Sequence, residues 1–299
     1  MSRDKTSKVA FVGAGAVGKT LAVALSRKGY PVVAAASRTF NSARDLAARV
    51  DGCRAYESIQ DAADCADFVF ITTFDGAIRP VAESINWRKG QGVAHCSGVT
   101  SLDVLEGPAR CGVEIGSLHP LQAFASVETA LEALPGSTFG IEGTGDIKAY
   151  LTTIAEELGG RPIALRSEDK PLYHASVVTI GGVLMGQAAV IAQIWQDRFG
   201  MPRNEANSSL MPIMKGVAEV IEANGFPDGI AGPYVRGDVG TVQKHLESMK
   251  SVGTEALQMY ATAALAGLPF ALEKGVADPS DAQEIERLLK AYIADNPIT

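Results

Sequence analysis

The feature that most constrains this chain is a glycine-rich turn close to its amino terminus. An apolar run that ends at Val12 is followed by Gly13-Ala14-Gly15-Ala16-Val17-Gly18 and then by a helical pattern. The order strand, G-x-G-x-x-G, helix is typical of a turn that binds the diphosphate of a dinucleotide at the helix amino terminus. We therefore expect Gly13, Ala14, Gly15, Ala16, Val17 and Gly18 to contact such a cofactor. A glycine-rich turn that binds nothing is the alternative.

The end of the next strand indicates which dinucleotide is bound. An NAD site usually places a carboxylate about twenty residues after the glycines, where it accepts from the ribose 2′-hydroxyl. Here Val32–Ala36 is followed by Ser37, Arg38 and Thr39, with no acidic residue. A hydroxyl beside a guanidinium suits a 2′-phosphate, because arginine forms forked, charge-assisted hydrogen bonds. The sequence therefore predicts NADP(H) as the cofactor, unless Arg38 merely covers the adenine of NAD.

The first half of the chain alternates short apolar runs with helical segments. These runs are rich in Val, Ile, Phe and Ala, as expected of parallel strands buried on both faces. We predict strands at Val9–Gly13, Val32–Ala36, Phe68–Thr72, Gly92–Cys96, Glu114–Leu118, Ser137–Ile141 and Pro162–Leu165. Such alternation predicts an α/β fold, an N-terminal doubly wound sheet of the Rossmann type.

From about Ser167 onwards, helical patterns dominate and strand patterns stop. One long helix is predicted from Lys170 to Phe199, with Pro171 in its first turn, and four more follow it. We therefore predict a boundary near residue 166, with a nucleotide-binding domain at 1–166 and an all-α substrate and dimerisation domain at 167–299.

Composition excludes several other classes of protein. The 299 residues carry a net charge of −7, which argues against a nucleic-acid surface. The four cysteines form no C-x-x-C pair and no zinc-ligand spacing, so we predict no metal and a reduced, cytoplasmic protein. The stretch Ala175–Trp195 has no charged residue and is long enough to cross a bilayer. Its glycines and glutamines favour a helix buried against other helices, and we expect no membrane partner.

Two further segments follow predicted strands at the edge where doubly wound folds bind ligands. Thr73 and Phe74 follow the strand at 68–72, and Ser97 follows the strand at 92–96. We predict that all three contact the cofactor.

Three polar clusters are candidates for the chemistry. His119 and Gln122 flank Pro120 at the end of a predicted strand, where His119 could donate a proton and Gln122 could hold substrate. A satisfied turn histidine is the alternative. Lys170 and His174 share one helical face and are further proton donors, unless they are an exposed lysine and a capping histidine.

The third cluster is the segment Gly232–His245. Arg236 could hold a substrate carboxylate through a bidentate contact, or it could brace its loop through Asp238. His245, one helical turn after Thr241, is a second substrate candidate.

At these clusters the sequence resembles a group of NADP-binding oxidoreductases with a Rossmann domain and an uncharacterised helical C-terminal domain. They belong to the assemblage of 6-phosphogluconate dehydrogenase, β-hydroxyacid dehydrogenases and pyrroline-5-carboxylate reductase. The specific segments are Gly116-Ser-Leu-His119-Pro-Leu-Gln-Ala-Phe124, Leu172-Tyr-His174-Ala and Gly232-Pro-Tyr-Val-Arg236-Gly-Asp238.

The resemblance implies reduction of a C=O or C=N bond by NADPH and a homodimer formed through the C-terminal helices. Relatives commonly carry an asparagine where this chain has Gly182. We therefore predict an NADPH-dependent oxidoreductase acting on a small, carboxylated metabolite. Two alternatives stay open: an NADP(H)-sensing module without turnover, and hydride transfer between NADP and a deazaflavin.

Overall fold

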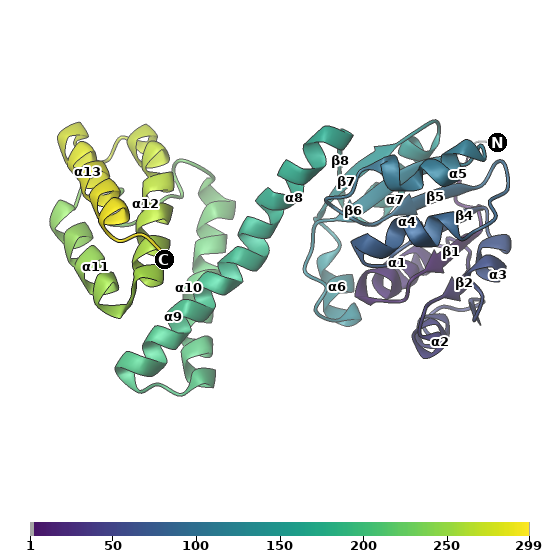
Figure 1. Cartoon of the computed structure of the whole chain (residues 1–299), viewed down its shortest axis with the longest axis horizontal. Helices are drawn as coiled ribbons and strands as arrows, with labels where there is room; N and C mark the ends of the chain where they lie inside the picture. The colour runs from purple at the N-terminus through teal and green to yellow at the C-terminus, as the bar shows by residue number, and fades with distance from the viewer. Residues whose placement is uncertain (1–2, 299) are drawn as a thin grey trace. The chain divides into compact units, whose positions relative to one another are not determined.

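The computed structural model describes residues 3–298 (Figure 1). The chain divides into two compact units, Met1–Gly181 and Gly182–Thr299. The first unit is an α/β domain and the second consists of helices, as the sequence predicts.

The first unit is built on one eight-stranded sheet with the order β3-β2-β1-β4-β5-β6-β7-β8. All neighbouring strands are parallel except β6 and β7. The chain therefore crosses over between β1 and β4, which is where doubly wound folds bind their ligands. The strands are β1 (Val9–Val12), β2 (Val32–Ala36), β3 (Arg54–Tyr56), β4 (Phe68–Ile71), β5 (Gly92–His95), β6 (Glu114–Pro120), β7 (Thr138–Gly143) and β8 (Arg161–Ala164).

Helices cover both faces of this sheet, so the central strands are buried on both sides. One face packs on α1 (Ala16–Arg27), α2 (Phe40–Ala48), α6 (Val127–Ala133) and α7 (Ile147–Glu157). The other packs on α3 (Ile59–Asp64), α4 (Asp75–Glu83) and the short helical segments η1 (Leu102–Leu105) and α5 (Glu106–Arg110). Side chains alternate between these two cores, because successive residues of a strand point to opposite faces.

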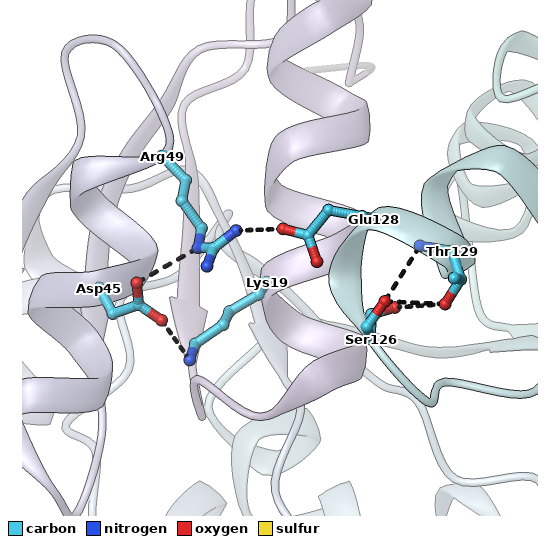
Figure 2. Close-up of polar contacts among 6 residues, drawn as sticks. All are labelled: Lys19, Asp45, Arg49, Ser126, Glu128 and Thr129. Carbon is cyan, nitrogen blue, oxygen red and sulfur yellow. Dashed lines mark hydrogen bonds and ion pairs between the residues drawn. The ribbon is translucent and has the colours of Figure 1, made fainter.

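A chain of ion pairs braces the helices that follow the first two strands (Figure 2). Lys19 of α1 pairs with Asp45 of α2 at 2.5 Å, and Arg49 contacts both Asp45 at 3.3 Å and Glu128 of α6 at 3.0 Å. Each pair is partly exposed and contributes little stability alone. Together they tie α2 to α1 and α6, and so fix the turn that precedes α2.

The second unit has two hydrophobic clusters. α9 (Leu184–Phe199) and α10 (Arg203–Asn224) pack through Ala192, Ala206 and Leu210. α11 (Val239–Val252), α12 (Thr254–Lys274) and α13 (Pro279–Asp295) share a separate core around Leu246, Leu257 and Leu289. Asp238 caps α11 by accepting from the Thr241 amide.

The predicted long helix is present with one irregular turn. α8 (Lys170–Val178) continues through a π-helical turn, η3 (Thr179–Val183), into α9. The two compact units meet at Gly181 and Gly182, fifteen residues after the boundary predicted at 166. The physical reason is that the first turns of α8 pack on β6 and β7, and so belong to the sheet domain.

The segment Ser167–Phe199 is long and apolar enough to span a membrane by length and composition. Only 6% of its most apolar window is buried within the single chain. The prediction of a helix buried against other helices is therefore wrong for one chain, since its apolar side chains lack a cover there.

Candidate active site

The glycine turn forms one wall of the main cavity of the first unit, about 580 Å³ in volume. Gly13 has φ 108°, and a Cβ on it would lie 2.7 Å from the Thr72 backbone, so this position needs glycine. A Cβ on Gly15 would meet no protein atom within 4 Å, so the backbone there is open to a ligand. Gly13, Ala14 and Gly15 line the cavity, whereas Ala16, Val17 and Gly18 lie in the first turn of α1.

The opposite wall follows β2. Ser37, Arg38, Thr39 and Ser42 line it, and no carboxylate is among the cavity's lining residues in the described chain. A cluster of hydroxyls beside a guanidinium matches the groups that a 2′-phosphate needs.

The segment after β4 completes the cavity with Thr73 and Phe74. The Thr73 hydroxyl is buried and has no hydrogen-bond partner within residues 3–298. Buried polar groups are normally hydrogen-bonded, so this hydroxyl is available to bond a ligand in the cavity. The Phe74 side chain is 68% exposed, which leaves its ring free to cover a bound cofactor. The open Gly15, the unpartnered Thr73 and the polar turn after β2 together fit a phosphorylated dinucleotide.

Ser97 is placed differently from the prediction. Its hydroxyl contacts the Thr100 hydroxyl at 2.9 Å and accepts from the Thr100 amide at 3.0 Å. Its side chain therefore closes a turn after β5 and does not line the cavity.

A second group of polar side chains gathers around the end of β6. His119 Nδ1 lies 2.9 Å from the Tyr173 hydroxyl of α8, and the His119 and His174 ring centroids are 5.7 Å apart. The loop after β5 lies against both histidines, because a Cβ on Gly98 would be 2.6 Å from His174 and 2.8 Å from His119. Because β1, β4, β5 and β6 are parallel, this cluster shares the sheet edge with the glycine turn.

Burial sets the protonation of this cluster. Desolvation, the nearby His174 and the Lys170 charge lower the pKa of His119 to about 4. Desolvation raises the pKa of the Tyr173 phenol to about 12. Near neutral pH the pair is therefore a neutral imidazole beside a protonated phenol, and the phenol can donate a proton while the imidazole holds it in place.

Lys170 is buried against the sheet, which contradicts the alternative of an exposed lysine. Its side chain is fully buried, and its ammonium donates to the Ser117 hydroxyl at 2.8 Å and lies 3.5 Å from a Glu142 oxygen. It is therefore not an exposed lysine. Desolvation lowers its pKa, and Glu142 opposes that shift.

Three other predicted site residues are Gln122, Arg236 and His245. The Gln122 amide donates to the Ala133 carbonyl at 3.0 Å and to Ser137 at 3.2 Å, so it braces a loop. Arg236 and His245 lie in the second unit. Arg236 is exposed and forms no ion pair among residues 3–298, while His245 Nδ1 lies 3.1 Å from the Tyr260 hydroxyl.

Sequence reasoning missed Tyr173, Glu142 and Ser117. Tyr173 had a usable signal, because it follows Lys170 by three residues and so shares its helical face. Glu142 and Ser117 had none, since only the pairing of β6 with β7 places them opposite each other.

Two protein-family models match this chain. Residues 8–97 match the family described as NADP oxidoreductase, coenzyme F420-dependent. Residues 137–266 match a domain of unknown function, DUF2520. The chain combines these two domains. It is an oxidoreductase of the NADP-linked kind, which confirms the predicted family and cofactor class at this level.

Solved structures show the same fold. TM1727 from Thermotoga maritima is 23% identical, with a TM-score of 0.68, and the alignment covers 94% of this chain and 99% of that one. A reductive aminase from Aspergillus terreus is 14% identical over 97% and 94%, with a TM-score of 0.59. A 1-pyrroline-5-carboxylate reductase from Streptococcus pyogenes is 14% identical over 97% and 100%, also at 0.59. A comparison with curated proteins finds no match.

Proposed function

We propose that this protein uses NADPH to reduce a C=N or C=O bond of a small metabolite. The observation that carries the proposal is the pairing, on one sheet edge, of a dinucleotide cavity with the His119–Tyr173–His174 cluster. A cavity alone would suit a cofactor-sensing module. A half-buried tyrosine–histidine pair at the same edge adds a proton source, which a reductase requires.

The chain's residues divide this work between them. Gly13, Gly15 and the α1 amino terminus would hold the diphosphate, and Ser37 and Arg38 would hold the 2′-phosphate. NADPH, when bound, supplies the hydride that reduces the carbon of the C=N or C=O bond. The Tyr173 hydroxyl would give its proton to the nitrogen or oxygen that gains the electron pair, and His119 would orient that hydroxyl.

A C=N bond is the first substrate class to test. The reductive aminase and the pyrroline-5-carboxylate reductase of the same fold are named for reactions at such bonds. For an unprotonated imine, hydride goes to the carbon and the Tyr173 proton goes to the nitrogen, so that the product is a neutral amine. A carboxylate on the substrate and its contact with Arg236 stay part of the proposal, supported by an exposed guanidinium without an ion pair.

The test is NADPH oxidation with a panel of cyclic imines, iminoacids and 2-oxoacids. Tyr173→Phe should lower kcat by about a hundredfold, the usual range for loss of a proton donor. The comparison variant is Tyr260→Phe, which removes the hydroxyl of the similar His245–Tyr260 pair in the second unit. NADPH binding without turnover of any panel member would favour the sensing module instead.

A second candidate function rests on the family match of residues 8–97, which is described as coenzyme F420-dependent. In this reaction hydride would pass between NADP and a deazaflavin. Loss of the deazaflavin absorbance on mixing with NADPH and the protein would establish it. The reaction needs no carbon acceptor, so it is distinguished from imine reduction by the spectrum alone.

We also propose that the protein is a cytoplasmic homodimer. All four cysteines are free thiols, as in a reducing compartment. Large apolar side chains are exposed along the helices from Lys170 to Asn224, among them Ile180, Met185, Phe199, Ile213 and Val217. Apolar area of this kind is uncommon on a monomer, and a second copy is the cover that we propose.

A further inference from the structure

A row of polar side chains crosses the buried face of the sheet beside the candidate active site. His95, Ser117 and Glu142 are direct neighbours on β5, β6 and β7. Because residues in register point to the same face, their side chains form one line under the start of α8. Lys170 reaches this line from α8 and contacts Ser117 and Glu142.

The Lys170–Glu142 pair is enclosed by the protein. The Lys170 side chain has no exposed surface and that of Glu142 is 11% exposed. One Glu142 oxygen accepts from the Ser167 hydroxyl, and the other has no hydrogen-bond partner within residues 3–298, with the Lys170 ammonium 3.5 Å away. A buried charge is retained only when paired, so each partner holds the other in the interior.

Strand and helix geometry connect this pair to the reacting groups. Ser117 and His119 lie two residues apart on β6 and so share a face. Lys170, Tyr173 and His174 lie three and four residues apart on α8 and share the facing side. A Cβ on Gly140 would lie 3.0 Å from the Tyr173 hydroxyl, so that hydroxyl sits directly on β7.

We propose that Lys170 and Glu142 are positioning residues, whose buried pair seats the first turn of α8 on β6 and β7 and thereby sets the contact between Tyr173 and His119. Lys170 is then not the proton donor, because its ammonium is buried and already committed to Ser117 and Glu142. This inference rests on the proposed reductase function, in which Tyr173 donates the proton.

The Lys170 charge has a second effect on His119. The titratable groups that influence this imidazole are Lys170, Tyr173 and His174 from α8, Asp75 from α4 and His95 from β5. The charge of Lys170 lowers the pKa of His119 and that of Asp75 raises it. Removal of the Lys170 charge should therefore raise the pKa of His119.

The decisive experiment follows the His119 ring by NMR titration in the cofactor-free protein, with His119→Gln used to identify its signal. The test variant is the double substitution Lys170→Met with Glu142→Gln. It removes both charges together, so that no unpaired charge is left in the interior. We expect the His119 pKa to rise, because the Lys170 charge is among the groups that lower it. Asp169→Asn is the matched control, since it breaks an exposed ion pair with Arg166 in the same turn and should leave the His119 pKa unchanged.

Lys170→Arg separates positioning from proton donation. Arginine keeps the positive charge and can bond Ser117 and Glu142, but it cannot release a proton near neutral pH. We expect this variant to keep the low His119 pKa and at least about a tenth of kcat.

Two results would overturn the proposal. One is a His119 titration that is identical in wild type and the double variant. The other is complete loss of turnover in Lys170→Arg with the His119 titration unchanged. Because the titration needs no substrate, absence of any reductase activity would refute the proposed function without deciding this inference.

Discussion

The glycines of the nucleotide turn show how one residue type serves two purposes. Gly13 is required by the fold, because a side chain there would collide with the Thr72 backbone. Gly15 has no such neighbour, so only a bound ligand can require it. We predict that Gly15→Ala keeps its melting temperature but binds NADPH about tenfold more weakly, as measured by fluorescence titration. Gly13→Ala should instead lower the melting temperature, since alanine is strained at φ 108°.

A substitution at Arg38 tests whether the cofactor is NADP(H) or NAD(H). If its guanidinium holds the 2′-phosphate, Arg38→Ala removes charge-assisted hydrogen bonds worth roughly 1.5–3 kcal/mol. NADPH affinity should then fall by about ten- to a hundredfold, whereas NADH affinity should change little, as measured by calorimetry. An equal loss for both cofactors would show that Arg38 only covers the adenine.

His119 also makes the stability of the protein depend on pH. Its folded pKa of about 4 lies below the 6.5 of a free imidazole, so the unfolded chain binds more protons between these values. The contribution of His119 to the free energy of unfolding should be complete above pH 6.5. As the pH drops to 4, the free energy of unfolding should fall by up to about 3 kcal/mol. His95, whose pKa desolvation lowers to about 3, acts in the same direction. Urea unfolding of His119→Gln should show a shallower decline, and an unchanged slope would contradict this account.

At the scale of elements, capping side chains define where several helices begin. Asp238 caps α11 by accepting from the Thr241 amide, and Pro171 lies in the first turn of α8 as predicted. The last helix, α13, begins at Pro279, and Asp278 caps it by accepting from the Ser280 amide at 2.8 Å.

The cap of α13 carries a prediction of its own. Asp278→Ala should lower the melting temperature by about 2–4 °C, the usual effect of losing a helix cap in a protein of this size. Ser280→Ala should have a smaller effect, because the Ser280 amide is retained and only its hydroxyl is lost. Thermal unfolding of both variants measures the difference, and equal shifts would show that Asp278 has no special part in capping α13.

For the whole molecule, the sequence was sufficient for the class of fold and for one half of the site. The glycine turn, Arg38 and Phe74 are contiguous with strand ends, so a linear pattern could place them. The Tyr173–His119 contact and the Lys170–Glu142 pair depend on how α8 lies across β6 and β7, and no local pattern encodes that. The division of the chain at Gly181 and Gly182 has the same basis, since the turns of α8 that follow residue 166 are held by the sheet.

The helices from Lys170 to Asn224 carry the last prediction, which concerns assembly. Ile180 and Met185 are 74% and 65% exposed. They lie on the segment Ser167–Phe199, which is long and apolar enough to span a membrane. Lys170, near the start of this segment, is enclosed by the sheet domain, which favours a protein partner over a bilayer for the rest. We expect light scattering at micromolar concentration to give a dimer of this chain. Met185→Glu should convert it to a monomer that still binds NADPH, whereas Val276→Glu, on the exposed turn after α12, should stay dimeric. A wild-type monomer, or partition of the protein into detergent micelles, would refute this assembly.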